Sequence, residues 1–78
     1  MSDYKMDIKG TIGLSEYSNI HDYLGLVDRD DSFTITLKEN SNQEINIINS
    51  MLVNNSFQIL SEGYDNKGIY HICAYKIK

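Results

Sequence analysis

The spacing of the apolar residues changes along this chain, and that change constrains the fold more than any other feature of the sequence. Over residues 4–14 apolar and polar side chains alternate, which predicts a strand with one buried face. Over residues 20–27 apolar side chains instead recur at every third or fourth position, as in an amphipathic helix. Either Ser15 or Ser18 can cap this helix, because both leave its apolar residues in phase.

The same change of period is repeated in the second half of the chain. Residues 33–37 alternate again and are rich in β-branched side chains, which predicts a second strand. Ser41 and Glu44 have the spacing of a capping box, and the apolar residues that follow recur with helical spacing. The pair Asn54-Asn55 suits a left-handed exit from this second helix.

The last part of the chain predicts a hairpin, with strands at residues 57–64 and 69–78 around a turn at residues 65–68. The order is therefore β-α-β-α-β-β, which we assign to the α/β class (α+β-like). We expect a four-stranded mixed sheet with two helices packed on one face. Helical crossovers make the first three strands parallel, and the hairpin makes the last pair antiparallel.

Length and composition limit the kind of protein to which such a sheet can belong. A chain of 78 residues, 41% of them hydrophobic and 23% charged, predicts one compact domain over residues 1–78. We expect a soluble cytoplasmic protein, because the chain has one cysteine, no signal-peptide pattern and no apolar stretch of membrane-spanning length. The net charge of −4 argues against binding to double-stranded nucleic acid.

The turn Asp65-Asn66-Lys67-Gly68 determines which side chains of the hairpin share a face. With a left-handed Gly68 the connection is bulged, and one face pairs Tyr64–Tyr70, Glu62–Ile72, Leu60–Ala74 and Gln58–Lys76. An unbulged loop would pair Tyr64 with Ile69 and shift every partner by one. We favour the bulged register. It places beneath the helices Phe57, Ile59, Cys73, Tyr75 and Ile77, in the pairs Phe57–Ile77, Ile59–Tyr75 and Ser61–Cys73. It places on the open face Leu60, Tyr64, Tyr70, Ile72 and Ala74.

An apolar patch on an open sheet face is typical of a binding surface, and tyrosine is a favoured anchor in protein interfaces. We therefore expect a partner protein to bind through Leu60, Glu62, Tyr64, Tyr70 and Ile72. Two alternatives stay open. A second copy of the chain could associate through the patch, or N-terminal residues or a loop of the same chain could cover it.

The acidic turn after the first helix is a second candidate surface, with Asp28, Asp30 and Asp31 as its binding residues. Segment Asp28–Glu39 resembles the EF-hand calcium loop, because oxygen-bearing side chains stand at loop positions one, three, five and twelve. The resemblance implies calcium binding by this loop. The segment departs from the family at Phe33, where the loop needs glycine, so a polar turn leading into a strand is the preferred interpretation.

No arrangement of residues in the sequence predicts catalysis. His71 and Cys73 stand two residues apart on one strand, which is awkward for a nucleophilic pair, and zinc would need two further ligands. We expect no enzyme activity, no catalytic residue, no metal site and no cofactor.

The sequence therefore predicts a small, acidic protein–protein interaction module. We expect a stand-alone accessory, regulatory or inhibitory protein of the type carried by phages and mobile elements. The alternative is weak binding of single-stranded nucleic acid on the same sheet face, towards which Lys5, Lys9, Lys38 and Lys76 are expected to point. Calcium binding by the Asp28–Glu39 loop is the third hypothesis.

Overall fold

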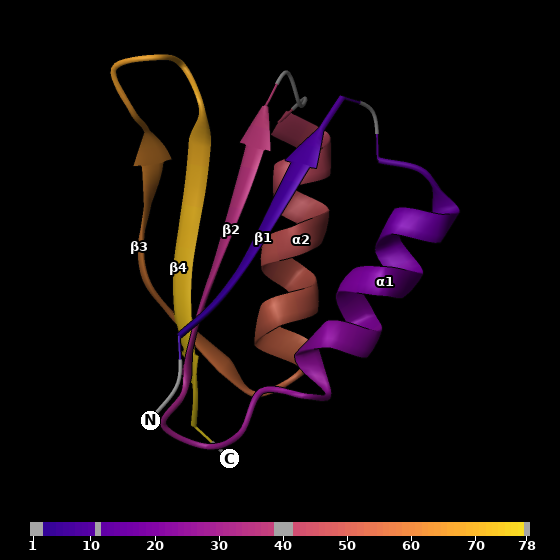
Figure 1. Ribbon diagram of the computed structural model, residues 1–78, viewed down its shortest axis with the longest axis vertical. Coiled ribbons are helices and arrows are strands. Elements are labelled where there is room, and N and C mark those ends of the chain that lie inside the picture. Colours follow the sequence, from indigo (N-terminus) through magenta and orange to yellow (C-terminus); the bar gives the residue numbers. More distant parts are fainter. Residues whose placement is uncertain (1–2, 11, 39–41, 78) are drawn as a thin grey trace.

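The computed structural model describes residues 3–10, 12–38 and 42–77 (Figure 1). Its elements follow in the order β1 (Asp3–Lys9), α1 (Leu14–Leu24), β2 (Ser32–Lys38), α2 (Asn42–Asn54), β3 (Phe57–Tyr64) and β4 (Tyr70–Lys76). The predicted four-stranded mixed sheet with two helices is confirmed. Neither helix in the described ranges is long and apolar enough to cross a membrane.

The strands lie in the order β1-β2-β4-β3, so β4 occupies a central position although it is the last strand along the chain (Figure 1). β1 runs parallel to β2, and β4 runs antiparallel to both β2 and β3. The first three strands therefore share one direction, as predicted. β3 does not touch β2, however, and it forms one edge of the sheet while β1 forms the other.

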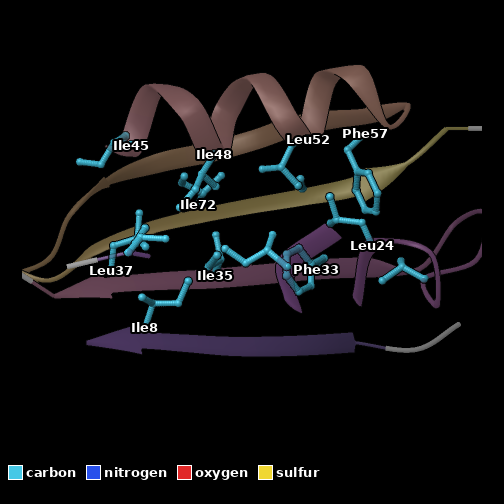
Figure 2. Packing of buried hydrophobic residues seen from close by; sticks show 14 residues of the cluster. Ile8, Leu24, Phe33, Ile35, Leu37, Ile45, Ile48, Leu52, Phe57 and Ile72 are labelled. Atoms are coloured by element: carbon cyan, nitrogen blue, oxygen red, sulfur yellow. The ribbon is translucent and has the colours of Figure 1, made fainter. Parts of the chain in front are cut away.

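The hydrophobic core lies between one face of the sheet and both helices (Figure 2). Alternate residues of the strands contribute to it, and α1 and α2 contribute residues at the predicted helical spacing. The buried apolar residues are Ile8, Ile12, Ile20, Leu24, Val27, Phe33, Ile35, Leu37, Ile45, Ile48, Leu52, Phe57, Ile72 and Ala74.

Phe33 on β2 is the centre of a chain of aromatic contacts through this core. Its side chain is fully buried, and its ring centroid lies 5.3 Å from that of Tyr23 and 6.3 Å from that of Phe57. Tyr23 also meets Tyr4 edge-on at 5.8 Å. These four rings belong to β1, α1, β2 and β3, so the contacts connect α1 with both edge strands.

The start of α1 differs from the prediction. The helix begins at Leu14, and no side-chain hydrogen bond caps it, so the proposed caps Ser15 and Ser18 are wrong. Gly10 has a left-handed φ of 74° directly after β1, which turns the chain out of the strand earlier than the alternation predicts. Leu14, which the alternation placed in the strand, is therefore a helical residue, and it is 83% exposed.

The ends of α2 also differ in detail. Of the predicted capping box, Ser41 lies outside the described residues, and the Glu44 side chain accepts a hydrogen bond from the backbone N–H of Ile12 at 2.7 Å. Glu44 therefore connects α2 to the segment before α1. At the other end the left-handed residue is Ser56, with φ 67°, rather than the pair Asn54-Asn55.

The hairpin turn has the predicted form. Gly68 is left-handed with φ 80°, and its N–H donates to the carbonyl oxygen of Asp65 at 3.1 Å. The Asp65 carboxylate accepts hydrogen bonds from the backbone N–H groups of Ile69 and Lys67 at 3.0 and 2.8 Å, and both bonds lower the pKa of that carboxyl.

A β-bulge at Leu60 changes the register farther from the turn. On the turn side of the bulge the predicted pairs Tyr64–Tyr70, Glu62–Ile72 and Ser61–Cys73 are present. Beyond it Ile59 pairs with Ala74, Gln58 with Tyr75 and Phe57 with Lys76. Four predicted pairs on this side of the bulge are therefore wrong: Leu60–Ala74, Gln58–Lys76, Ile59–Tyr75 and Phe57–Ile77. The extra residue shifts the alternation of the β3 side chains by one position, so Phe57 and Ile59 lie on the same face as Ile72.

The strand order also corrects the predicted faces of the hairpin. In β4, Ile72 and Ala74 lie opposite Ile35 and Phe33 of β2, and all four are buried on the helix-covered face. Tyr70 packs against the same core. Cys73 and Tyr75, which we expected beneath the helices, alternate with these residues and face the open side. Ile77, also expected there, is 44% exposed. The apolar patch predicted on the open face is therefore not formed by the described residues.

Candidate protein-binding site at the edge of strand β3

Four of the five residues predicted to form the patch still lie close together, but at a different place. Glu62, Tyr64 and Tyr70 lie on the helix-covered side of the sheet, where β3 forms its free edge, and Leu60 is the bulged residue of the same edge. The fifth residue, Ile72, is fully buried in the core and is not accessible to a partner.

Glu62 is held in place from two sides. Nδ2 of Asn49 on α2 donates a hydrogen bond to Oε1 of Glu62 at 3.1 Å, and the hydroxyl of Tyr70 donates to the same oxygen. The ring of Tyr70 meets that of Tyr64 edge-on, with centroids 4.8 Å apart. Oδ1 of Asn49 is buried and has no hydrogen-bond partner among the described residues. These contacts fix the rotamers around the Glu62 carboxylate.

The hydrogen bond to Glu62, followed by burial, raises the pKa of Tyr70 from 10.0 to about 12. Because the folded pKa lies above the ordinary one, the protonated hydroxyl stabilises the fold below pH 10, and this contribution is lost as the pH rises through about 12. In an alkaline titration followed by NMR of the tyrosine rings, we expect Tyr70 to ionise well above its ordinary range. In the variant Glu62→Gln its pKa should fall back towards 10.0. A Tyr70 pKa that did not change in this variant would contradict the hydrogen bond.

The elements that hold this polar group, β3 and α2, also carry exposed apolar side chains. Leu60 is 58% exposed, Tyr64 is 60% exposed, and Val53 on α2 is 61% exposed. Neither Val53 nor Asn49 was among the residues predicted from the sequence. Their four-residue spacing places them on one side of α2, but the sequence alone does not show that β3 lies beside that side.

The two edges of the sheet are unlike. On β1 four exposed residues of alternating charge, Asp3, Lys5, Asp7 and Lys9, follow one another at every second position. On β3 Glu62 is the only charged residue, and the strand contains neither lysine nor proline. Charged side chains, lysine above all, and proline are the usual means by which an edge strand is kept from pairing with another chain. The β3 edge has one charge and the bulge at Leu60, but it has neither lysine nor proline, and its residues 61–64, on the turn side of the bulge, pair regularly with β4.

The acidic turn is mainly structural. Asp31 is buried, and its carboxylate accepts a hydrogen bond from the backbone N–H of Asp28 at 3.1 Å. The backbone of the turn is joined to β4, because the N–H of Asp30 donates to the carbonyl oxygen of Lys76 and the N–H of Lys76 donates to that of Asp31. Of the three predicted binding residues, Asp28 and Asp30 are exposed.

The segment that resembles a calcium loop does not have the form of one. Strand β2 begins at Ser32, and Phe33 is buried in the core at the position where the loop needs a glycine turn. This confirms the interpretation of a polar turn leading into a strand. Glu39, the last expected ligand, lies outside the described residues. Within the described ranges no group of three His, Cys, Asp or Glu residues is placed to hold a metal ion.

The open face of the sheet is polar. Cys73 lies opposite Thr34 and Ser61, and His71 lies opposite Thr36. Three lysines, Lys5, Lys9 and Lys38, belong to the register positions that face this side. The fourth lysine predicted there, Lys76, lies instead across from Phe57, and its Nζ is 5.9 Å from the centroid of that ring.

Comparisons of the chain with models of protein families, with curated proteins and with solved structures found no match. The function is therefore inferred from the residues and their geometry.

Proposed function

We propose that this chain is a non-enzymatic protein–protein interaction module that binds its partner along the edge of β3. The observation that carries the proposal is the combination found there. β3 is an edge strand with one charged residue, it carries the exposed side chains of Leu60 and Tyr64, and α2, which packs against it, carries the exposed side chain of Val53. An edge strand offers a row of backbone donors and acceptors to an incoming chain, and neighbouring apolar side chains add contact area.

The fixed side chains favour binding further. A group that is already held in one rotamer loses little conformational entropy when a partner binds. Glu62 is held by Asn49 and Tyr70, and the ring of Tyr64 rests against that of Tyr70. Tyrosine is also enriched among the residues that contribute most to protein interfaces.

If the partner binds along this edge, removing the exposed apolar side chains of the edge should weaken its binding. The tagged wild-type chain and the double variant Leu60→Ser/Tyr64→Ser are used to capture proteins from a lysate of the host cell. The proteins captured by the wild type should bind the variant about tenfold more weakly or worse, since removing one or two anchors costs at least about 1.4 kcal/mol. Its melting temperature should change little, because both side chains are more than half exposed.

A matched control removes two apolar side chains elsewhere. Leu14 and Leu26 are 83% and 66% exposed, and neither belongs to β3. The variant Leu14→Ser/Leu26→Ser should capture the same proteins as the wild type. Equal capture by all three chains, or equal loss in both double variants, would contradict binding through the β3 edge.

Single-stranded nucleic acid on the open face is the second candidate, and one observation favours it. Lys5, Lys9 and Lys38 share that face with Tyr75 and His71, whose rings are suited to base stacking. Capture that is removed by nuclease and falls steeply with salt would support this candidate. Binding of nucleic acid should also be the same in the Leu60→Ser/Tyr64→Ser variant as in the wild type.

A further inference from the structure

We propose that the partner at this edge is a second copy of the chain, whose β3 strand pairs antiparallel with the first about a two-fold axis at Gly63. The two four-stranded sheets would then form one continuous sheet. This inference rests on the proposed function, because it names the partner of the same edge.

The hydrogen-bonding phase of β3 can be derived from the turn. The N–H of Asp65 donates to the carbonyl oxygen of Ile69 at 2.9 Å, so Asp65–Ile69 is a hydrogen-bonded pair. Opposite residues of antiparallel strands alternate between hydrogen-bonded and non-hydrogen-bonded pairs, which makes Tyr64–Tyr70 and Glu62–Ile72 non-hydrogen-bonded. The N–H and C=O groups of Glu62 and Tyr64 therefore point to the free edge, where they can pair with another strand.

Charge selects the register between two copies. Two copies form hydrogen bonds only if the residues whose N–H and C=O groups point to the free edge lie opposite each other. A two-fold axis can therefore lie at Glu62, at Gly63 or at Tyr64. An axis at Glu62 places two carboxylates directly opposite, which is unfavourable. An axis at Tyr64 pairs Glu62 with Asn66 of the second copy, in the turn beyond the strand, and so shortens the ladder. An axis at Gly63 pairs each Glu62 with Tyr64 of the other copy.

The pair Glu62–Tyr64 is chemically complementary. The two hydrogen bonds that Glu62 accepts both end on Oε1, which leaves Oε2 for a donor from outside. The hydroxyl of Tyr64 donates no hydrogen bond to the described residues. A tyrosine hydroxyl can donate to a carboxylate, and the two-fold axis gives this contact twice.

Gly63 suits the position on the axis. Opposite residues of a non-hydrogen-bonded pair are the closest in an antiparallel sheet, with Cα atoms about 4.5 Å apart. Glycine has no side chain, so none collides with the second copy across the axis. Apart from Gly63 and its two chain neighbours, no heavy atom lies within 4 Å of the place where a Cβ would be, so this side of the residue is uncovered.

The β1 edge offers no equivalent. The hydroxyl of Tyr23 on α1 donates to the backbone carbonyl oxygen of Lys5 at 3.4 Å, so an acceptor of that strand is already used. The exposed charges of Asp3, Lys5, Asp7 and Lys9 would also have to be brought against another chain. We therefore expect dimers through β3 rather than open chains of molecules joined at both edges.

Sedimentation equilibrium over micromolar to millimolar concentrations tests the pairing. The wild type should show the mass of two chains at the upper end, and added salt should strengthen the association, because each copy carries a net charge of −4. The variants Tyr64→Ala and Tyr64→Pro both lack the ring, but only the proline lacks the N–H at the edge. We expect Tyr64→Ala to weaken the dimer and Tyr64→Pro to weaken it at least tenfold more.

Cross-linking tests the register. In a Cys73→Ser background, chains carrying Glu62→Cys are mixed with chains carrying Tyr64→Cys and then oxidised. The mixture should give a disulfide-linked heterodimer, since hydrogen-bonded pairs have Cα atoms about 5.5 Å apart, while each variant alone should give little linked product. Efficient linkage of the Tyr64→Cys chain to itself, which retains both Glu62 carboxylates, would overturn the axis at Gly63.

Failure of self-pairing and failure of the proposed function would give different results in these experiments. A wild-type chain that stays monomeric up to millimolar concentration, or dimers equally stable in Tyr64→Ala and Tyr64→Pro, would overturn self-pairing through β3. Loss of capture in the Leu60→Ser/Tyr64→Ser variant would still support the proposed function in that case, because that experiment requires no self-association. Monomers together with unchanged capture would contradict both.

Discussion

Replacing Phe33 by alanine is expected to lower the free energy of unfolding by about 3–5 kcal/mol, the usual cost of removing a buried aromatic ring. A chain of 78 residues has roughly 4–12 kcal/mol to lose at about 0.05–0.15 kcal/mol per residue, so this one change should remove a large fraction of the stability. The reason is the position of the ring. It is fully buried and contacts Tyr23 and Phe57, so its loss leaves a cavity between α1 and the sheet.

Urea unfolding followed by circular dichroism measures this effect. The control is Thr34→Ala, one position along β2, whose side chain lies on the polar open face. This control should change the free energy of unfolding by no more than about 1 kcal/mol. If the two variants were equally stable, Phe33 would not be buried, and the alternative that it lies in a polar loop would be favoured.

The second large effect is expected for Ile72→Ala, which should lower the free energy of unfolding by about 2–5 kcal/mol. Ile72 is fully buried opposite Ile35, in the middle of the sheet. Had it stood on the open face, as the hairpin pattern alone predicts, the same change would cost little stability and would act on partner binding.

The neighbouring residue provides the comparison for Ile72. Cys73 is half-buried on the opposite face of β4, and Cys73→Ala should cost clearly less than Ile72→Ala in the same unfolding experiment. A larger loss for Cys73→Ala would mean that β4 faces the other way and that the corrected register is wrong.

The sequence predicts the elements of this fold well because each has a strong local period. The alternation over residues 33–37 and the helical spacing of Ile45, Ile48 and Leu52 are present before any tertiary contact is considered. The turn at Gly68 is equally local, since its left-handed φ and the side chain of Asp65 determine it within five residues.

The strand order and the bulge depend on contacts that no local pattern contains. The hairpin alone allows either Ile72 or Cys73 to face the helices, and the choice is made by the pairing of β4 with β2. Leu60 has no sequence signal of a bulge comparable with a glycine. The bulge is favoured because it allows Phe57, Ile59 and Ile72 to be covered on one face, which is a property of the whole sheet.

The candidate site, like the fold, could be predicted where it depends on local patterns and not where it depends on tertiary contacts. Leu60, Glu62, Tyr64 and Tyr70 could be found from the sequence, because hairpin pairing brings them together. Their place at an edge could not be found, since it follows from the insertion of β4 between β2 and β3. Asn49 and Val53 escaped notice for a related reason, because the packing of α2 beside β3 is a tertiary contact.

The central place of β4 has a consequence for how the protein is made. During synthesis β1, β2 and β3 are made before residues 70–76, yet β3 is next to no strand other than β4. Without β4 in place, β3 has no neighbour in the sheet, and β2 has only β1 beside it. The sheet can therefore be completed only by inserting β4 between two strands made earlier, and any opening that removes β4 exposes both edges of β3.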